Sequence, residues 1–416
     1  MASRYYKRSK IRLTLLCWLL VATLVKAATT EIMSDSPEKI GGGAINEKKR
    51  SFRASGTNTV ESQEIGYNPL LSKSHLMHAI EGLDRYPNYL SRWSLEDTNM
   101  LERGLEERLA MVKSQKKQVI QERNAVQRLV TRIIKEYPEF KDFLKPPDSW
   151  QEVKDNILDP RASKAIFKAN PFLQREKPNI QDVISGKTLI ELNVGQLEHL
   201  MEEEMFDVYS FPLLEPSFCA KLRLFFQRVM TEVNENSDYS HLSRQIIIDL
   251  DNLGFKWLND LLFHLVIRPM SSHLFKTTEM GEGDLDFRHG YIAAYSAKPT
   301  DTKPRQRLVP HTDDSEVTLN LCIGEQFEGG ELQFWGLRGS ADEGTLVGNF
   351  RPQIGRALLH AGRHLHEVQT VKEGNRFALI IWSRSWSGIR AKSCPCCWLN
   401  RREDAKKSCI CGPRWN

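Results

Sequence analysis

The sequence predicts an α+β protein in which a largely α-helical region precedes a jelly-roll domain of antiparallel strands. Apolar residues recur at helical spacing along residues 95–136, and short strand-like runs with glycine- and proline-containing turns fill residues 206–388. With 416 residues, 40% of them hydrophobic, the chain can bury one sizeable core or two modest ones. These observations favour a folded, mixed architecture over a repeat or fibrous protein.

The first 27 residues have the pattern of a secretory signal peptide. A basic start, "SRYYKRSKIR", precedes the apolar run "LTLLCWLLVATLV", and small residues around Ala27 offer a cleavage site. A membrane-crossing helix needs roughly 20 apolar residues, so this run is short for an anchor. We therefore expect the endoplasmic reticulum lumen or secretion, with a membrane anchor as the alternative if the segment is not cleaved and a mitochondrial presequence as a third interpretation.

Residues 28–65 are polar and carry almost no large apolar side chains, which predicts a disordered linker.

The formal net charge of +5 is small for a chain of this length. Nucleic-acid binders concentrate basic residues on one face of a folded domain, so no specific nucleic-acid partner is expected.

Residues 66–205 are expected to be mainly helical, with one long helix at residues 95–136. Ser94 and Asp97 have the spacing of a capping box, and Pro138 predicts the helix end because the residue before a proline disfavours helix. A seven-residue apolar repeat suits either a helix packed on its own domain or the seam of a homodimeric coiled coil. The repeat consists of Leu105, Val112, Val119, Val126 and Ile133.

A second amphipathic helix is expected from Pro216, after the strand-like "VYSFP". The rest of the domain alternates apolar and polar residues in short runs, as half-buried strands do. The runs are "GYIAAYSA", "EVTLNLCIG", "GELQFWG", "RALLHAG", "HEVQTV" and "RFALIIWS".

His311 and Asp313 are separated by one residue, which places both side chains on the same face of a strand. A metal held by this pair needs a further ligand, and the run "LLHAGRHLHEV" offers His360, His364 and His366. Two histidines and one carboxylate on one side of an ion leave three positions open, which is the facial triad of non-haem Fe(II) oxygenases.

Arg376 follows His366 by ten residues (376 − 366 = 10), in a strand expected after a turn at Gly374 and Asn375. A guanidinium keeps its charge when buried and binds a carboxylate with two parallel hydrogen bonds. If the open metal positions chelate 2-oxoglutarate, Arg376 is suited to its distal carboxylate.

Taken together, these motifs resemble the 2-oxoglutarate and Fe(II)-dependent oxygenases of the prolyl-4-hydroxylase type. The resemblance is especially to the animal "2-oxoglutarate and iron-dependent oxygenase domain-containing" proteins and their plant relatives, and it covers residues 208–385. It implies a double-stranded β-helix, which is a jelly roll, at residues 206–388. The motifs that carry it are "FPLLEPSFC", "PHTDDSEVTLN", "FEGGEL", "LHAGRHLH" and "GNR".

The resemblance implies that His311, Asp313 and His366 are the iron ligands, His366 being the histidine that keeps the family's ten-residue step to the arginine. It implies that Arg376 binds 2-oxoglutarate and that Tyr295 helps. Trp382, Thr318 and Asn320 also match the family pattern, with Trp382 either lining the pocket or belonging to the core.

The implied activity is hydroxylation of a protein side chain of the prolyl or lysyl type, with O₂ consumed and succinate and CO₂ released. Ascorbate is implied as a reductant by the resemblance alone. Two alternatives remain at this point: an oxygenase for another substrate, such as a methylated lysine, and a catalytically silent scaffold or binding protein. The intact ligand set and Arg376 favour an enzyme.

Five of the eight cysteines lie in the tail, residues 389–416. Cys394 and Cys397 form a C-x-x-C pair, and Cys409 and Cys411 a C-x-C pair, which together could bind structural zinc. In an oxidising compartment the same residues would instead form disulfides, and an unstructured reactive tail is the third interpretation.

Overall fold

The computed structural model describes residues 80–387, apart from residues 81, 84–85, 87, 198, 237–238, 240–246, 276–283 and 299–304. The predicted signal peptide or anchor, the linker at residues 28–65 and the cysteine-rich tail, with its zinc or disulfide alternatives, lie outside the described residues. The chain divides into two compact units, Met1–Gln118 and Val119–Asn416, and the boundary falls within a continuous helix.

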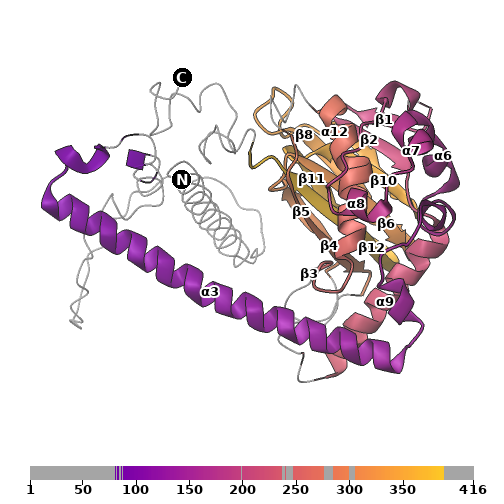
Figure 1. Cartoon of the computed structure of the whole chain (residues 1–416), viewed down its shortest axis with the longest axis horizontal. Helices are drawn as coiled ribbons and strands as arrows, with labels where there is room; N and C mark the ends of the chain where they lie inside the picture. Colours follow the sequence, from indigo (N-terminus) through magenta and orange to yellow (C-terminus); the bar gives the residue numbers. More distant parts are fainter. Residues whose placement is uncertain are drawn as a thin grey trace, which may run out of the picture. The chain divides into compact units, whose positions relative to one another are not determined.

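That helix, α3, runs from Leu95 to Glu136 and confirms the predicted start and end (Figure 1). The backbone N–H of Asp97 donates to Ser94 Oγ at 3.0 Å, and Ser94 Oγ donates to Asp97 Oδ2 at 2.7 Å. The predicted cap is therefore formed, which satisfies one of the N–H groups that a helix start leaves unpaired. Within the first unit, buried Leu101 packs against buried Ile80.

Short helices and helix α9 cover one face of the larger sheet in the second unit. Leu129 and Ile133 of α3, Phe225 of α9 and Leu379 of the sheet belong to one buried cluster, so helices and sheet share a core. None of the described helices has both the length and the hydropathy of a membrane-crossing segment. The helical elements are η2 Tyr89–Arg92, α4 Phe140–Phe143, α5 Trp150–Glu152, η3 Val153–Ile157, α6 Pro160–Ala169, α7 Pro171–Arg175, α8 Ile180–Ile184, η4 Val194–Gln196, α9 Pro216–Glu235, α11 Lys256–Leu262, η6 Phe263–Ile267 and α12 Arg268–Leu274.

The described strands form an eight-stranded sheet in the order β1-β2-β10-β6-β12-β4-β3, with β7 paired to β12, and a four-stranded sheet in the order β5-β11-β8-β9. From β4 onward the chain passes repeatedly between the two sheets, and neighbouring strands are antiparallel. This interleaved order is that of a double-stranded β-helix, so the predicted jelly roll is confirmed. The strands are β1 Glu202–Met205, β2 Val208–Pro212, β3 Ile247–Asp249, β4 Phe287–Ser296, β5 Leu308–His311, β6 Val317–Gly324, β7 Phe327–Gly329, β8 Leu332–Leu337, β9 Gly348–Phe350, β10 Arg356–Ala361, β11 His364–Val368 and β12 Val371–Arg384.

The two faces of the larger sheet belong to different cores. On β12, Leu379 and Ile381 pack with the helices, whereas Ala378 and Ile380 join a second cluster that includes Phe334 of the smaller sheet. Because successive side chains of a strand point to opposite faces, this alternation identifies the inner face of the jelly roll. Arg376 and Tyr295 lie on that inner face, whereas His311 and His366 belong to the smaller sheet.

The turn expected at Gly374 and Asn375 is wrong, because β12 passes through both residues without a break. Gly374 adopts a φ of +70°, and the pairing of β12 with β7 shifts register nearby, between Val371 and Glu373. A Cβ at Gly374 would lie 2.2 Å from the carbonyl oxygen of Gln326. The glycine thus allows an irregularity within a strand instead of ending it.

Candidate metal centre

Antiparallel pairing brings together two histidines that are far apart in the sequence. His311 is the last residue of β5, and the register places it directly opposite His366 of β11. Their ring centroids are 4.4 Å apart. Asp313 follows β5 by two residues, where the chain turns toward β6, so its carboxylate reaches the same point from the connection between sheets.

His311, Asp313 and His366 each offer one ligand atom, and these atoms all lie within 4.8 Å of one another. His311 Nε2 is 3.7 Å from Asp313 Oδ1, and His366 Nε2 is 3.8 Å from Asp313 Oδ2. The structure therefore brings together the three residues predicted as ligands. Two imidazole nitrogens and one carboxylate form the donor set that suits non-haem Fe(II) and leaves open positions.

Hydrogen bonds fix the orientation of these side chains. His311 Nδ1 lies 2.9 Å from the carbonyl oxygen of Val309, and His366 Nδ1 lies 2.8 Å from that of His364. A carbonyl can only accept, so each Nδ1 carries the proton and each Nε2 keeps the lone pair that a metal needs.

The carboxylate of Asp313 is held by a hydroxyl pair. Thr318 Oγ1 donates to Asp313 Oδ2 at 2.7 Å, and Ser315 Oγ lies 2.7 Å from Thr318 Oγ1. Thr318 is buried, and its bond to Asp313 places it on the inner face of β6. Such outer hydrogen bonds orient a metal-binding carboxylate and tune its affinity.

Burial and charge keep the triad in its metal-binding protonation state. Burial lowers the pKa of His366 to about 3. Burial alone would raise the pKa of Asp313, but His366, His311 and His360, with the Thr318 hydrogen bond, hold that pKa below its ordinary value. At neutral pH His366 is thus neutral and Asp313 is ionised, which are the forms that bind a metal.

The other two candidate histidines have different roles in the structure. His364 Nε2 lies 2.9 Å from the carbonyl oxygen of Phe206, which turns it away from the triad. His360 Nε2 is 3.9 Å from Asp313 Oδ2, but His360 is not part of the group whose ligand atoms lie mutually within 4.8 Å. Among the three histidines, His366 has the position that the family resemblance implied.

Arg376 is fully buried on the inner face of β12, directly opposite Tyr295 of β4. Its Nη2 donates to Asn320 Oδ1 at 3.5 Å, while Nε and Nη1 have no partner. Its Cζ lies 5.2 Å from the centre of the Tyr295 ring. A buried guanidinium with unfilled donors is costly unless a ligand pairs with it, so this end of the site fits a carboxylate.

Several inner-face residues were missed from the sequence. Arg305 places a second guanidinium 5.6 Å from the Tyr295 ring. Tyr291 and His289 continue the inner row of β4, and Tyr291 packs edge-to-face on Trp382 at 5.6 Å. The run "HGYIAAYS" was the available signal. Alternate residues of a strand share a face, so His289 and Tyr291 had to lie on the same face as Tyr295.

Comparison with known proteins confirms the resemblance that the motifs indicate. The "2-oxoglutarate and iron-dependent oxygenase domain-containing protein ICU11" of Arabidopsis thaliana is 30% identical over 266 residues, which are 60% of this chain and 59% of that protein. The human "2-oxoglutarate and iron-dependent oxygenase domain-containing protein 2" is 28% identical over 49% of this chain and 55% of that protein. The rat "Multifunctional procollagen lysine hydroxylase and glycosyltransferase LH3" is 29% identical over 44% of this chain and 24% of that protein.

The chain thus spans only 51% to 62% of the length of the oxygenase domain-containing relatives it matches. No family model matches the chain. Among solved structures, a Pseudomonas putida prolyl-4-hydroxylase is 16% identical with a TM-score of 0.32, covering 50% of this chain and 96% of that one.

Proposed function

We propose that this chain, a homologue of the 2-oxoglutarate and iron-dependent oxygenase domain-containing proteins, is an Fe(II)- and 2-oxoglutarate-dependent dioxygenase. The observation that carries the proposal is that strand β6 connects the His311–Asp313–His366 triad with the buried Arg376, whose Nε and Nη1 are unpaired: Thr318 bonds Asp313 and Asn320 bonds Arg376. The triad alone would also suit zinc, and a buried arginine alone would suit many anions. Together they match a metal that chelates a 2-oxo acid and a cation that binds its second carboxylate.

The residues present fit iron and 2-oxoglutarate. When bound, Fe(II) would supply the activation of O₂ and the oxidation of a substrate C–H bond, coupled to conversion of 2-oxoglutarate to succinate and CO₂. His311 and His366 would bind the metal through Nε2, because their Nδ1–H groups are already committed to carbonyl oxygens. Asp313 would contribute the single negative charge of the ligand set.

Arg376 would orient 2-oxoglutarate through its distal carboxylate. Asn320 holds one edge of the guanidinium and leaves Nε and Nη1 free to donate. The arginine is fully buried, so water does not compete for these donors and the charge-assisted bonds are strong. The Tyr295 ring, 5.2 Å from the guanidinium carbon, adds a cation–π contact to the arginine.

For the substrate we propose a protein side chain of the prolyl or lysyl type. The name of one relative, a procollagen lysine hydroxylase, supports this class. The basic and apolar start of the sequence supports action in the secretory pathway, and ascorbate would serve as the reductant there.

Turnover of 2-oxoglutarate by the purified full chain tests the function. Reconstitution with Fe(II) under controlled oxygen should give succinate that depends on both iron and 2-oxoglutarate. His311→Ala should abolish it, whereas His273→Ala, which changes an exposed histidine of α12, should not. A wild-type chain that forms no iron-dependent succinate, with or without protein substrates, would favour the silent scaffold.

A further inference from the structure

The inner row of β4 leads from a closed end of the site to an open one. Tyr295 and Ala293 are each 3% exposed, and Tyr291 is 8% exposed. His289, next in the row, has 35% of its side chain exposed. These four residues share one face because they alternate along the strand.

The adjacent row of β12 has the same gradient. Arg376 is fully buried opposite Tyr295, and Ile380 is 7% exposed. Trp382, directly opposite His289, is only half-buried. The end that holds the arginine is therefore closed, and the end that holds His289 and Trp382 reaches solvent.

The metal position lies near the open end of these rows. Asp313 accepts a hydrogen bond from Thr318, and Thr318 lies directly opposite Trp382, which in turn lies opposite His289. The segment after Asp313 also reaches the open end of β12, where Arg384 Nη2 pairs with Asp314 Oδ2 at 3.1 Å. A substrate that approaches the triad from solvent would thus pass His289 and Trp382.

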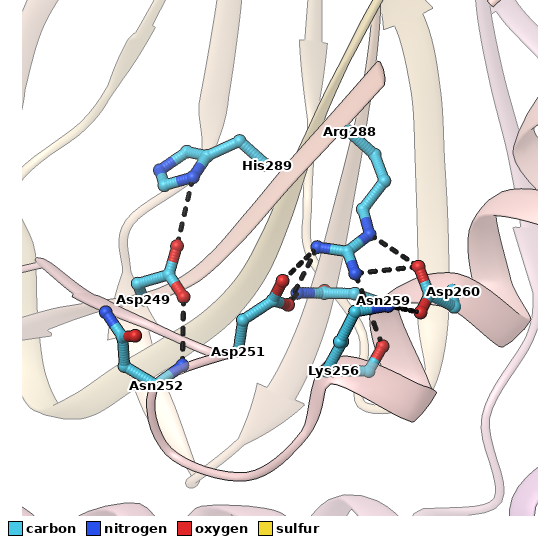
Figure 2. A network of polar contacts seen from close by, with 8 residues as sticks. All are labelled: Asp249, Asp251, Asn252, Lys256, Asn259, Asp260, Arg288 and His289. Carbon is cyan, nitrogen blue, oxygen red and sulfur yellow. Dashed lines mark hydrogen bonds and ion pairs between the residues drawn. The ribbon is translucent and has the colours of Figure 1, made fainter. Parts of the chain in front are cut away.

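His289 is held in place by Asp249, the last residue of β3 (Figure 2). His289 Nδ1 donates to Asp249 Oδ2 at 3.1 Å, and Asp249 Oδ1 accepts the backbone N–H of Asn252 at 3.0 Å. The imidazole ring packs 5.7 Å from the Tyr291 ring. With its proton on Nδ1, the partly exposed ring presents the Nε2 lone pair to a hydrogen-bond donor.

The other charges near this pair balance one another, which leaves the carboxylate of Asp249. The neighbouring carboxylates Asp251 and Asp260 both pair with Arg288, at 2.6 and 2.7 Å, and Lys256 adds a second cation at Asp260 (Figure 2). Within the described residues, Asp249 has no arginine or lysine partner. Arg384, whose Cζ is 5.8 Å from the Trp382 ring, is itself paired with Asp314.

We infer that His289, oriented by Asp249, is a substrate-positioning residue that accepts a hydrogen bond from a basic side chain of a polypeptide substrate. This inference rests on the proposed function and selects a lysyl or arginyl residue, at or beside the reacting position, over a prolyl one. A prolyl side chain has neither a donor for Nε2 nor a positive charge for Asp249 to attract. An ammonium or guanidinium group has both.

Binding of peptide pools to the full chain tests the inference without turnover. The protein is loaded with Mn(II) and N-oxalylglycine, a non-reacting analogue of 2-oxoglutarate. It is then applied to bead-bound peptides that have degenerate flanks and a fixed central lysine, norleucine, proline or glutamate. Retention on the lysyl pool should exceed that on the norleucyl and glutamyl pools by about five-fold, the scale of a partly exposed ion pair.

Two variants and one control complete the experiment. Asp249→Asn, which removes the charge and keeps the shape, and His289→Phe, which keeps a ring, should each reduce the lysyl preference to about that of the norleucyl pool. Asp155→Asn, an exposed aspartate of the helical layer, should keep the preference. Melting temperatures show whether each variant is folded.

The outcomes separate this inference from the proposed function. Equal retention of all pools, no retention of any, or an unchanged lysyl preference in both folded variants would overturn the inference. If the same wild-type preparation forms iron-dependent succinate, the dioxygenase assignment then still stands. A lysyl preference without any succinate would instead overturn the proposed function.

Discussion

Thr318 is the residue on which the geometry of the metal-binding carboxylate most depends. Its hydroxyl donates to Asp313 Oδ2 from the next strand, and the site is too buried for water to replace it readily. Thr318→Val removes the donor with little change in volume. We expect the affinity for Mn(II), measured by titration, to fall about 10- to 100-fold. Thr345→Val, at an exposed threonine, is the control, and equal affinities in the two variants would refute this role.

Arg376 should contribute to 2-oxoglutarate binding far more than an exposed arginine does. Two charge-assisted hydrogen bonds are worth about 3 kcal/mol or more in a buried site, so Arg376→Gln should weaken binding of 2-oxoglutarate to the Mn(II)-loaded protein by at least about 100-fold. Isothermal titration against Arg351→Gln, a change at an exposed arginine, makes the comparison. Similar dissociation constants for both variants would mean that the distal carboxylate binds elsewhere.

The buried histidines make the metal-free protein sensitive to acid. Burial lowers the pKa of His366 to about 3 and that of His360 to about 4, whereas an unfolded histidine titrates near 6.5. The unfolded state therefore binds more protons below about pH 6.5, and the free energy of unfolding falls as the pH drops from there toward 4.

Urea denaturation at pH 7 and pH 5.5 measures this effect. Each of the two histidines should cost about 1 kcal/mol of stability over that interval. His360→Phe should lose its share of the pH dependence, while His273→Phe, at an exposed position, should keep the full dependence. A wild-type stability that does not change between the two pH values would contradict the assignment of neutral buried histidines.

At this scale the motifs predicted the triad residues and Arg376. The expected strand that carries both His311 and Asp313 was wrong, because β5 ends at His311 and Asp313 reaches the site from the connection to β6. The motifs could not predict from the residues alone which of three histidines completes the triad. That choice depends on the register between β11 and β5, which pairs His366 with His311 and is set by contacts distant in sequence. His289 and Arg305 were missed for a similar reason. His289 is part of the site because it lies opposite Trp382, and Arg305 because it lies near Tyr295, and neither contact can be read from the sequence.

Helix α3 has an unusual distribution of exposed apolar side chains. Val126 and Ile133 of the predicted repeat are buried in the second unit, and Leu101 is buried in the first. Between them, Val119 is 59% exposed and Ile120 48% exposed. The second interpretation of the repeat, a homodimeric coiled coil through this helix, would cover these side chains.

Sedimentation of the full chain tests this dimer. The coiled-coil interpretation predicts a dimer for the wild type and a monomer for Val119→Glu, because a buried carboxylate in the seam has no partner. Lys117→Glu, at an exposed position of the same helix, changes the charge in the same direction and should leave the dimer intact. A monomeric wild type, or an unchanged dimer in Val119→Glu, would contradict the prediction.

The strands were predictable as separate elements and less so at their ends. Alternation located β4, β6, β8 and β10 well, since each has one face on a core. It predicted that the last strand begins after a turn at Gly374. In the structure the last two strands, β11 and β12, are separated by residues 369–370. A glycine in a strand signals either a turn or an irregularity, and the pairing of β12 with β7 favours the second here.

In the second unit, one long strand connects the parts of the jelly roll. β12 pairs with β4, β6 and β7, carries Arg376 at the closed end of the site and ends beside the open one. The sequence could predict a jelly roll from its runs and motifs, but not this pairing, which depends on contacts between residues far apart. The helical layer shares its core with the larger sheet, so the sheet that bears the site is supported on its outer face.

The central claim is that the triad and Arg376, from the two sheets of the jelly roll, hold Fe(II) and 2-oxoglutarate together. An anaerobic titration of the full chain with both tests it, because Fe(II) chelated by a 2-oxo acid gives a visible charge-transfer absorption. We predict that this absorption saturates at one Fe(II) and one 2-oxoglutarate per chain and disappears in Asp313→Ala and in His366→Ala. A wild-type chain without the absorption, or one whose absorption survives either substitution, would contradict the claim.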